Sequence, residues 1–66
     1  MFKMKGTKLI CIENGEVQFT YDTFEHVFEF PKEPKVSIIH TVEGENESLA
    51  KYLENVKAMA ARLRKE

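Results

Sequence analysis

The last third of the chain carries apolar residues at the spacing of an amphipathic α-helix. These residues recur at steps of four, three, four and three: Leu49, Leu53, Val56, Ala60 and Leu63. Together with Tyr52 and Met59, these residues form an apolar arc of about 120°, which is wider than a coiled-coil seam and suits a helix lying across a sheet. Asn46 suits the N-cap, and Arg62 and Arg64 suit the negative end of the helix dipole. The pattern predicts a helix over residues 46–65.

An alternating pattern precedes this helix and predicts a β-hairpin. Residues 8–13 and 16–21 flank Asn14-Gly15, a strong signal for a two-residue type I′ turn. With an unbroken register, Ile12 lies opposite Val17 and Ile10 opposite Phe19, and opposed residues share a face. The face expected under the helix therefore holds Ile10, Ile12, Val17, Phe19 and Tyr21.

Two further segments complete the predicted sheet. Residues 24–30 alternate as a third strand, although residues 22–25 also match a helix-capping pattern, so a short helix is the alternative there. Residues 35–42 alternate as a fourth strand after a loop bounded by Pro31 and Pro34. It pairs with either the third or the first strand.

The expected fold class is α+β. We predict a three- to four-stranded antiparallel sheet, a β-meander or a close variant, with one C-terminal amphipathic helix packed on one face. We expect one domain over residues 1–66, in which residues 1–7 form a flexible or strand-extending arm, residues 8–42 the sheet and residues 46–65 the helix.

The size of the chain indicates that the domain is only marginally stable. A domain near 66 residues buries only about 60% of the surface that its unfolded chain exposes. The single cysteine, Cys11, cannot form an internal disulfide, and two histidines do not give a zinc-finger spacing. Oligomerisation is then the remaining means of stabilisation. No apolar window approaches the ~20 residues of a membrane span, so we expect no membrane association and a cytoplasmic protein.

The residues most often used in catalysis are scarce. His26 and His40 fall on apolar strand faces, where a partly buried side chain at the rim of a core is their commonest role. Cys11 lies mid-strand, where a small buried hydrophobe is the usual interpretation. Glu13 and Glu16 face each other at the hairpin tip, where both are solvated and do not differ in environment as an acid–base pair must. We expect no catalytic residue, no cofactor and no metal.

The face of the sheet away from the predicted helix is more apolar than a solvated face needs to be. The unbroken register places four apolar residues there: Leu9, Cys11, Val27 and Ile39. Exposed apolar area of this kind usually marks an interface. We therefore expect a homodimer formed through sheet pairing or, alternatively, through the low-relief helix flank of Ala50, Ala58 and Ala61.

The net charge of −1 hides an uneven distribution. Residues 1–8 carry three lysines and no acid, residues 9–50 carry nine acids against two lysines, and residues 51–66 carry five bases against two acids. The candidate contacts to a phosphate backbone lie in the basic ends: Lys3, Lys5, Lys57, Arg62, Arg64 and Lys65.

These observations favour a small non-catalytic interaction or regulatory protein that binds another macromolecule as a homodimer. Chains of this size without catalytic groups are frequent among accessory proteins of phages and other mobile elements, which gives one expectation of origin. The alternative is a nucleic-acid-binding module that uses the basic N- and C-terminal segments. The sequence does not identify the protein partner.

Overall fold

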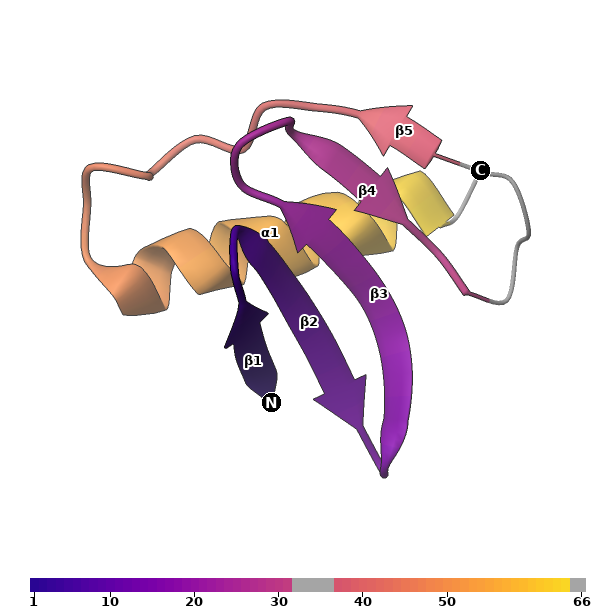
Figure 1. Cartoon of the computed structure of the whole chain (residues 1–66). Coiled ribbons are helices and arrows are strands. Elements are labelled where there is room, and N and C mark those ends of the chain that lie inside the picture. The colour runs from indigo at the N-terminus through magenta and orange to yellow at the C-terminus, as the bar shows by residue number, and fades with distance from the viewer. Residues whose placement is uncertain (32–36, 65–66) are drawn as a thin grey trace.

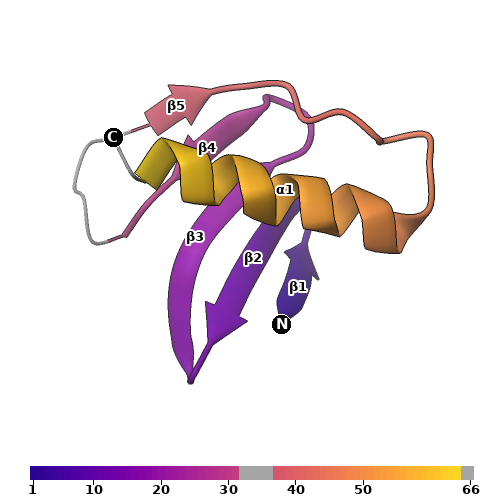
Figure 2. The same cartoon turned by 180° about the vertical axis from the view of Figure 1, so that it is seen from behind.

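The computed structural model describes residues 1–31 and 37–64, which form a five-stranded antiparallel sheet with one helix across one face (Figures 1 and 2). The strands follow one another in chain order: β1 (Phe2–Lys5), β2 (Lys8–Glu13), β3 (Glu16–Asp22), β4 (Val27–Glu29) and β5 (Ser37–Ile39). The helix α1 (Leu49–Arg64) ends the described chain. The predicted α+β class, with an antiparallel sheet and a C-terminal helix, is confirmed.

The predicted count of three to four strands is wrong, because residues 2–5 form a strand of their own. In β1, Phe2 lies opposite Cys11 and Met4 opposite Leu9, so both apolar residues join the helix-covered face of the sheet. Lys3 and Lys5 alternate with them and point to the other face. The short segment pairs because its alternation matches that of β2.

The β2–β3 hairpin has the predicted turn but not the predicted register. Asn14 and Gly15 both have positive φ, 54° and 76°, as a type I′ turn requires. Ile12 lies opposite Val17 as expected. The register then shifts at a β-bulge, and Gln18 is the additional residue that has no partner in β2. Beyond the bulge the pairs are Cys11 with Phe19, Ile10 with Thr20 and Leu9 with Tyr21.

The bulge reverses which residues of β2 face the helix. Leu9 and Cys11, expected on the uncovered face, are 6% and 2% exposed in the core. Ile10, Ile12 and Val17, expected under the helix, lie on the uncovered face instead. The prediction was wrong because one added residue in a strand moves the following side chains to the opposite face.

A turn, and not a helix, connects β3 to β4. One carboxylate oxygen of Asp22 accepts hydrogen bonds from the backbone N–H groups of Phe24 and Glu25, at 2.8 and 2.9 Å. His26 follows with a positive φ of 59°, and β4 begins at the next residue. The predicted third strand is therefore shorter than residues 24–30. β5 pairs beside β4, and the predicted start of the fourth strand lies outside the described residues, as do Pro34 and Lys65.

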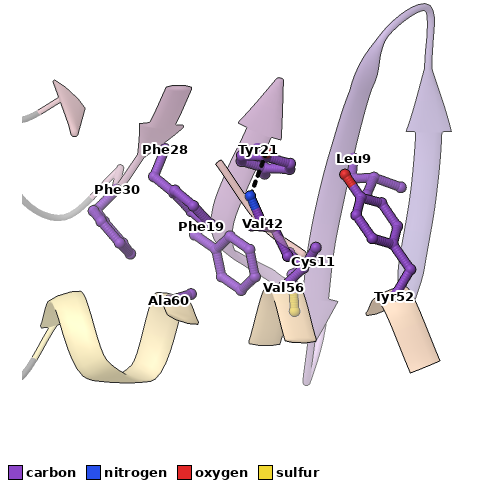
Figure 3. Packing of buried hydrophobic residues seen from close by; sticks show 10 residues of the cluster. All are labelled: Leu9, Cys11, Phe19, Tyr21, Phe28, Phe30, Val42, Tyr52, Val56 and Ala60. Carbon is purple, nitrogen blue, oxygen red and sulfur yellow. Dashed lines mark hydrogen bonds between the residues drawn. The ribbon is translucent and has the colours of Figure 1, made fainter. Parts of the chain in front are cut away.

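The core fills the space between α1 and the covered face of the sheet (Figure 3). Its buried members come from all layers of the fold: Leu9, Cys11, Phe19, Tyr21, Phe28, Phe30, Val42, Tyr52, Val56 and Ala60. The helix therefore uses most of its apolar arc within the monomer, as its width predicts. Leu49 is the exception, because 69% of it is exposed.

The N-cap of the helix is Ser48, two residues later than the predicted Asn46, and α1 begins at Leu49. The hydroxyl oxygen of Ser48 accepts a hydrogen bond from the N–H of Lys51 at 3.3 Å, which is the capping contact expected of Asn46. The preceding loop is held by Asn55, whose side-chain amide donates to the carbonyl oxygen of Glu43 at 2.9 Å. At Gly44 a Cβ atom would lie 2.7 Å from that amide nitrogen, so the close approach requires glycine.

Candidate interaction surfaces

The face of the sheet opposite the helix is open and carries a group of apolar side chains, which we call the open face. Its apolar members come from four strands: Ile10, Ile12, Val17, Val27 and Ile39. Of these, Ile39 is 72% exposed and Val17 38% exposed. Val27 lies opposite Ile39, and Ile12 lies opposite Val17. Two of the four residues predicted for this face, Val27 and Ile39, are therefore on it, and Leu9 and Cys11 are not.

Charges on the open face are segregated across the sheet. Lys3, Lys5 and Lys8 project from β1 and β2, at the edge where the chain begins. Glu29 projects from β4 opposite Thr20, and Asp22 ends β3 opposite Lys8. One half of this face is therefore basic and the other half acidic, with the isoleucines and valines between and beside them.

The outer edge of β1 presents backbone groups that the sheet does not use. Met1 and Ile12 exchange two backbone hydrogen bonds, of 3.0 and 2.7 Å. In an antiparallel ladder such pairs alternate with pairs that do not exchange hydrogen bonds, so the N–H and C=O groups of Phe2 and Met4 point away from β2. Within the described residues, no element lies beyond this edge. The sequence analysis missed the edge, although its signal was present in the alternation of residues 2–5.

A groove with almost entirely apolar walls runs beside this edge, and we call it the β1–α1 groove. It has a volume of about 290 Å³. Its lining comes from β1, β2, the β3–β4 turn and the first turns of the helix: Phe2, Lys3, Met4, Leu9, Thr23, Leu49, Tyr52 and Leu53. Figures 1 and 2 show that the first turns of α1 extend past β1. Side chains of the helix therefore overhang the space next to the strand.

The basic residues predicted to contact nucleic acid do not form one patch. Lys3 lines the groove beside the first turns of α1, whereas Arg62 lies at the other end of the helix next to Ile38. Lys57 pairs with Glu13 at 3.5 Å. The guanidinium of Arg64 lies 5.8 Å from the centre of the Phe30 ring and donates to the side-chain oxygen of Gln18 at 3.4 Å.

The alanines predicted as a helix-pairing flank, Ala50, Ala58 and Ala61, are all exposed. At 100° per residue they lie within one outward arc of about 80° on α1. Ala61 also lines a shallow hollow beside Phe19, and Ala58 lines a different one beside Thr41. Helix pairing through this flank stays a prediction.

The residues with reactive side chains serve the core. Tyr21 is fully buried, and its hydroxyl shares a 3.0 Å hydrogen bond with Nδ1 of His26 and accepts one from the N–H of Val42 at 3.4 Å. Burial, with Tyr21 beside it, raises the pKa of Tyr52 to about 12. Burial likewise raises the pKa of the Cys11 thiol, which disfavours a reactive thiolate.

Metal ligands are not clustered in the part of the chain that the structure describes. In residues 1–31 and 37–64, no group of three or more histidine, cysteine or carboxylate side chains is placed to hold a metal ion. In the same residues, no helix has both the length and the apolar surface that crossing a bilayer requires. The features that the geometry does offer to a ligand are the open face, the edge of β1 and the β1–α1 groove.

Comparison with known proteins adds no family to this description. No protein-family model, curated protein or solved structure matches the chain. The surfaces of the molecule are therefore the only guide to its function.

Proposed function

We propose that this chain is a small non-catalytic interaction protein that acts as a homodimer and binds another macromolecule. The observation that carries the proposal is the open face, where apolar side chains of β2, β3, β4 and β5 stay uncovered because the single helix packs on the other side. Contiguous exposed apolar area on a small protein is typical of an interaction site. For a chain of this size, the additional buried area also stabilises the fold.

The segregated charges favour a second copy as the occupant of the open face. Two sheets that pack face to face about a two-fold axis along the strands place the β1–β2 half of one copy over the β4–β5 half of the other. Lys8 of β2 then lies over the strand that carries Glu29 in the second copy, while the apolar centres meet and Lys3 and Lys5 stay at the outer rim of the contact. A two-fold axis across the strands would oppose lysines with lysines, so the charges also select the orientation.

Face-to-face pairing leaves the β1–α1 groove accessible for the proposed binding of another macromolecule. The β1–α1 groove opens on the helix side of the sheet, away from the proposed dimer contact. Each dimer therefore presents two such grooves to other macromolecules. Two linked sites raise the apparent affinity for a partner that carries two binding segments.

Light scattering over a dilution series tests the homodimer. We expect a dimer mass at micromolar concentration for the natural sequence and a monomer mass for Ile39→Lys, which places a positive charge over the lysines of the second copy. Ala50→Lys is the matched control, because it adds the same charge on the exposed side of the helix and leaves the dimer intact. A monomer mass for the natural sequence with a folded circular dichroism spectrum contradicts the proposal, and dissociation by Ala50→Lys alone indicates helix pairing instead.

A further inference from the structure

We infer that the edge of β1 binds an extended segment of a partner protein as a sixth strand, in which apolar residues alternate with acidic ones. The apolar residues enter the β1–α1 groove, and the acidic residues lie opposite Lys3 and Lys5 on the open face. This inference names the partner chemistry for the proposed function and rests on its binding part. It does not require the homodimer.

The backbone of β1 supplies the first component of this site. The N–H and C=O groups of Phe2 and Met4 point outward from the sheet edge, at the spacing that a neighbouring strand needs. A strand added there makes main-chain hydrogen bonds whatever its side chains are, and alternate side chains then give the specificity. β1 contains no proline and no inward-pointing charge, but it is short and carries two lysines, which disfavour unspecific edge pairing and leave the edge selective for an acidic strand.

The groove supplies the second component. Residues of an added strand that lie opposite Phe2 and Met4 point to the helix side, where Leu49 and Leu53 line the groove. Met4 and Leu49 are 58% and 69% exposed, so both have apolar surface available for burial. Each apolar side chain buried there contributes roughly 25 cal/mol per Å² of area removed from water. The groove therefore selects apolar residues at alternate positions of the segment.

The lysines supply the third component and identify the occupant. Residues of an added antiparallel strand that lie opposite Lys3 and Lys5 share their face, and opposite charges in such cross-strand pairs are stabilising. The acidic residues of the segment belong on this side and not in the groove, because the groove walls are almost entirely apolar and would leave a carboxylate without a partner. The lysines thus select acidic residues on one face of the bound segment, and the groove selects apolar residues on its other face.

The same charges argue against a second copy of this chain at this edge. Pairing β1 with β1 of another copy, with Phe2 and Met4 both used, places lysines opposite lysines. Pairing β1 with β5 of another copy joins two different edges, which makes an open head-to-tail chain and not a closed dimer. A partner segment with acidic residues avoids both problems.

Short capped peptides test the inference on the full chain. One probe alternates valine with glutamate, a second alternates valine with lysine, and a third has the first composition in scrambled order. Fluorescence anisotropy measures binding, and amide chemical shifts of Phe2 and Met4 report where the peptide binds. We expect the valine–glutamate peptide to bind most tightly and to shift those two amides.

Variants then separate the three components. Lys3→Glu with Lys5→Glu should weaken the valine–glutamate peptide by about tenfold and strengthen the valine–lysine peptide, because several cross-strand charge pairs reverse. Arg62→Glu, at the other end of α1, is the matched charge control and should leave both affinities unchanged. Met4→Pro removes an outward-pointing donor and should abolish binding, whereas Leu49→Ser should weaken it with little effect on the fold because that residue is exposed.

Several outcomes overturn the inference. They are equal affinity for the two charged peptides, equal weakening by Arg62→Glu and by the lysine variants, binding unchanged by Leu49→Ser, and no binding to the natural sequence at millimolar peptide. Light scattering on the same samples keeps the two proposals separate. A dimer that binds no peptide contradicts only the partner segment, and a monomer that binds the peptide contradicts only the homodimer.

Discussion

The two faces of the sheet are both apolar, yet only one of them is a core. Along β4, Phe28 is fully buried under the helix while its neighbour Val27 lies half-buried on the open face. Along β5, Ile38 packs against the core while Ile39 is 72% exposed. The first difference between the two faces is that the helix covers only one of them. An apolar strand face therefore predicts that another part of the protein, or another chain, covers it. The position of the helix determines which of the two covers each face.

The distribution of aromatic rings is a second difference between the faces. The helix-covered face holds Phe19, Phe28 and Phe30, whose ring centres lie 6.0 to 6.4 Å from one another, and Tyr21, which lies 4.4 Å from Phe28. The open face carries aliphatic side chains among charges. Large rings bury the most area per residue and suit a permanent core. Smaller aliphatic groups among charges suit a contact with another chain.

The largest effect that we predict separates two adjacent residues of β4. Phe28→Ala removes a fully buried ring and should destabilise the fold by about 3–5 kcal/mol, which is most of the stability of a chain this small. Val27→Ala, on the open face, should cost less than about 1 kcal/mol in dilute solution. Urea denaturation followed by circular dichroism measures both variants.

The same pair of variants also bears on the homodimer. If Val27 contributes to the dimer contact, Val27→Ala should lose more stability at high protein concentration than at low concentration, because association stabilises the folded state by mass action. Equal losses for Phe28→Ala and Val27→Ala at high dilution would mean that the two faces are equally buried in the monomer, contrary to the structure.

The second prediction concerns the bulge, which assigns residues of β2 to their faces. Cys11 lies in the core because Gln18 has no partner in β2, and an unbroken hairpin that paired Gln18 would leave the Cys11 thiol on the open face. The thiol should therefore react with a water-soluble disulfide reagent far more slowly in the native protein than in urea, at a rate set by opening of the structure. Matched labelling of an Ala50→Cys, Cys11→Ser variant, whose thiol lies on the exposed side of the helix, gives the rate for an accessible thiol.

Rapid labelling of native Cys11, at the rate of that reference thiol, would contradict the observed register. Deleting Gln18 sharpens the test, because the deletion removes the bulge while Ile12 can still pair with Val17 and Cys11 with Phe19. In the deletion variant, Cys11 should therefore stay on the covered face and stay unreactive in the native protein.

The sequence was sufficient for the elements but not for the faces of the first hairpin. Asn14-Gly15 fixes the turn, and the apolar arc of residues 49–63 fixes the helix and its packing on a sheet. In β2, however, Leu9 and Cys11 are about as apolar as Ile10 and Ile12, so alternation alone does not say which pair is buried. The choice depends on distant contacts, in which Glu13 meets Lys57 and Gln18 meets Arg64.

The candidate surfaces were predictable to the same limited extent. Val27 and Ile39 were placed correctly on the open face because β4 and β5 have no bulge between them. The β1–α1 groove was not predicted, since it forms only when residues 2–5 pair with β2 and the helix extends past them. Four alternating residues are too few to establish a strand without that tertiary context.

The smallest effect that we predict concerns the carboxylate of Asp22. It tests whether the charge of this residue stabilises the β3–β4 turn. Asp22 ends β3, and its carboxylate accepts hydrogen bonds from the N–H of Glu25, from that of Phe24 and from the hydroxyl of Thr7. These hydrogen bonds, the one from Glu25 above all, hold the pKa of Asp22 below its ordinary value of 3.8.

A carboxylate whose folded pKa is lowered stabilises the fold above the unfolded pKa, and this stabilisation is lost as pH falls through the folded pKa. Asp22→Asn should therefore lower the urea midpoint slightly at neutral pH, and the two curves should converge below about pH 3. Parallel curves from neutral to acidic pH would show that the charge of Asp22 does not hold the turn, and would leave it available to the open face.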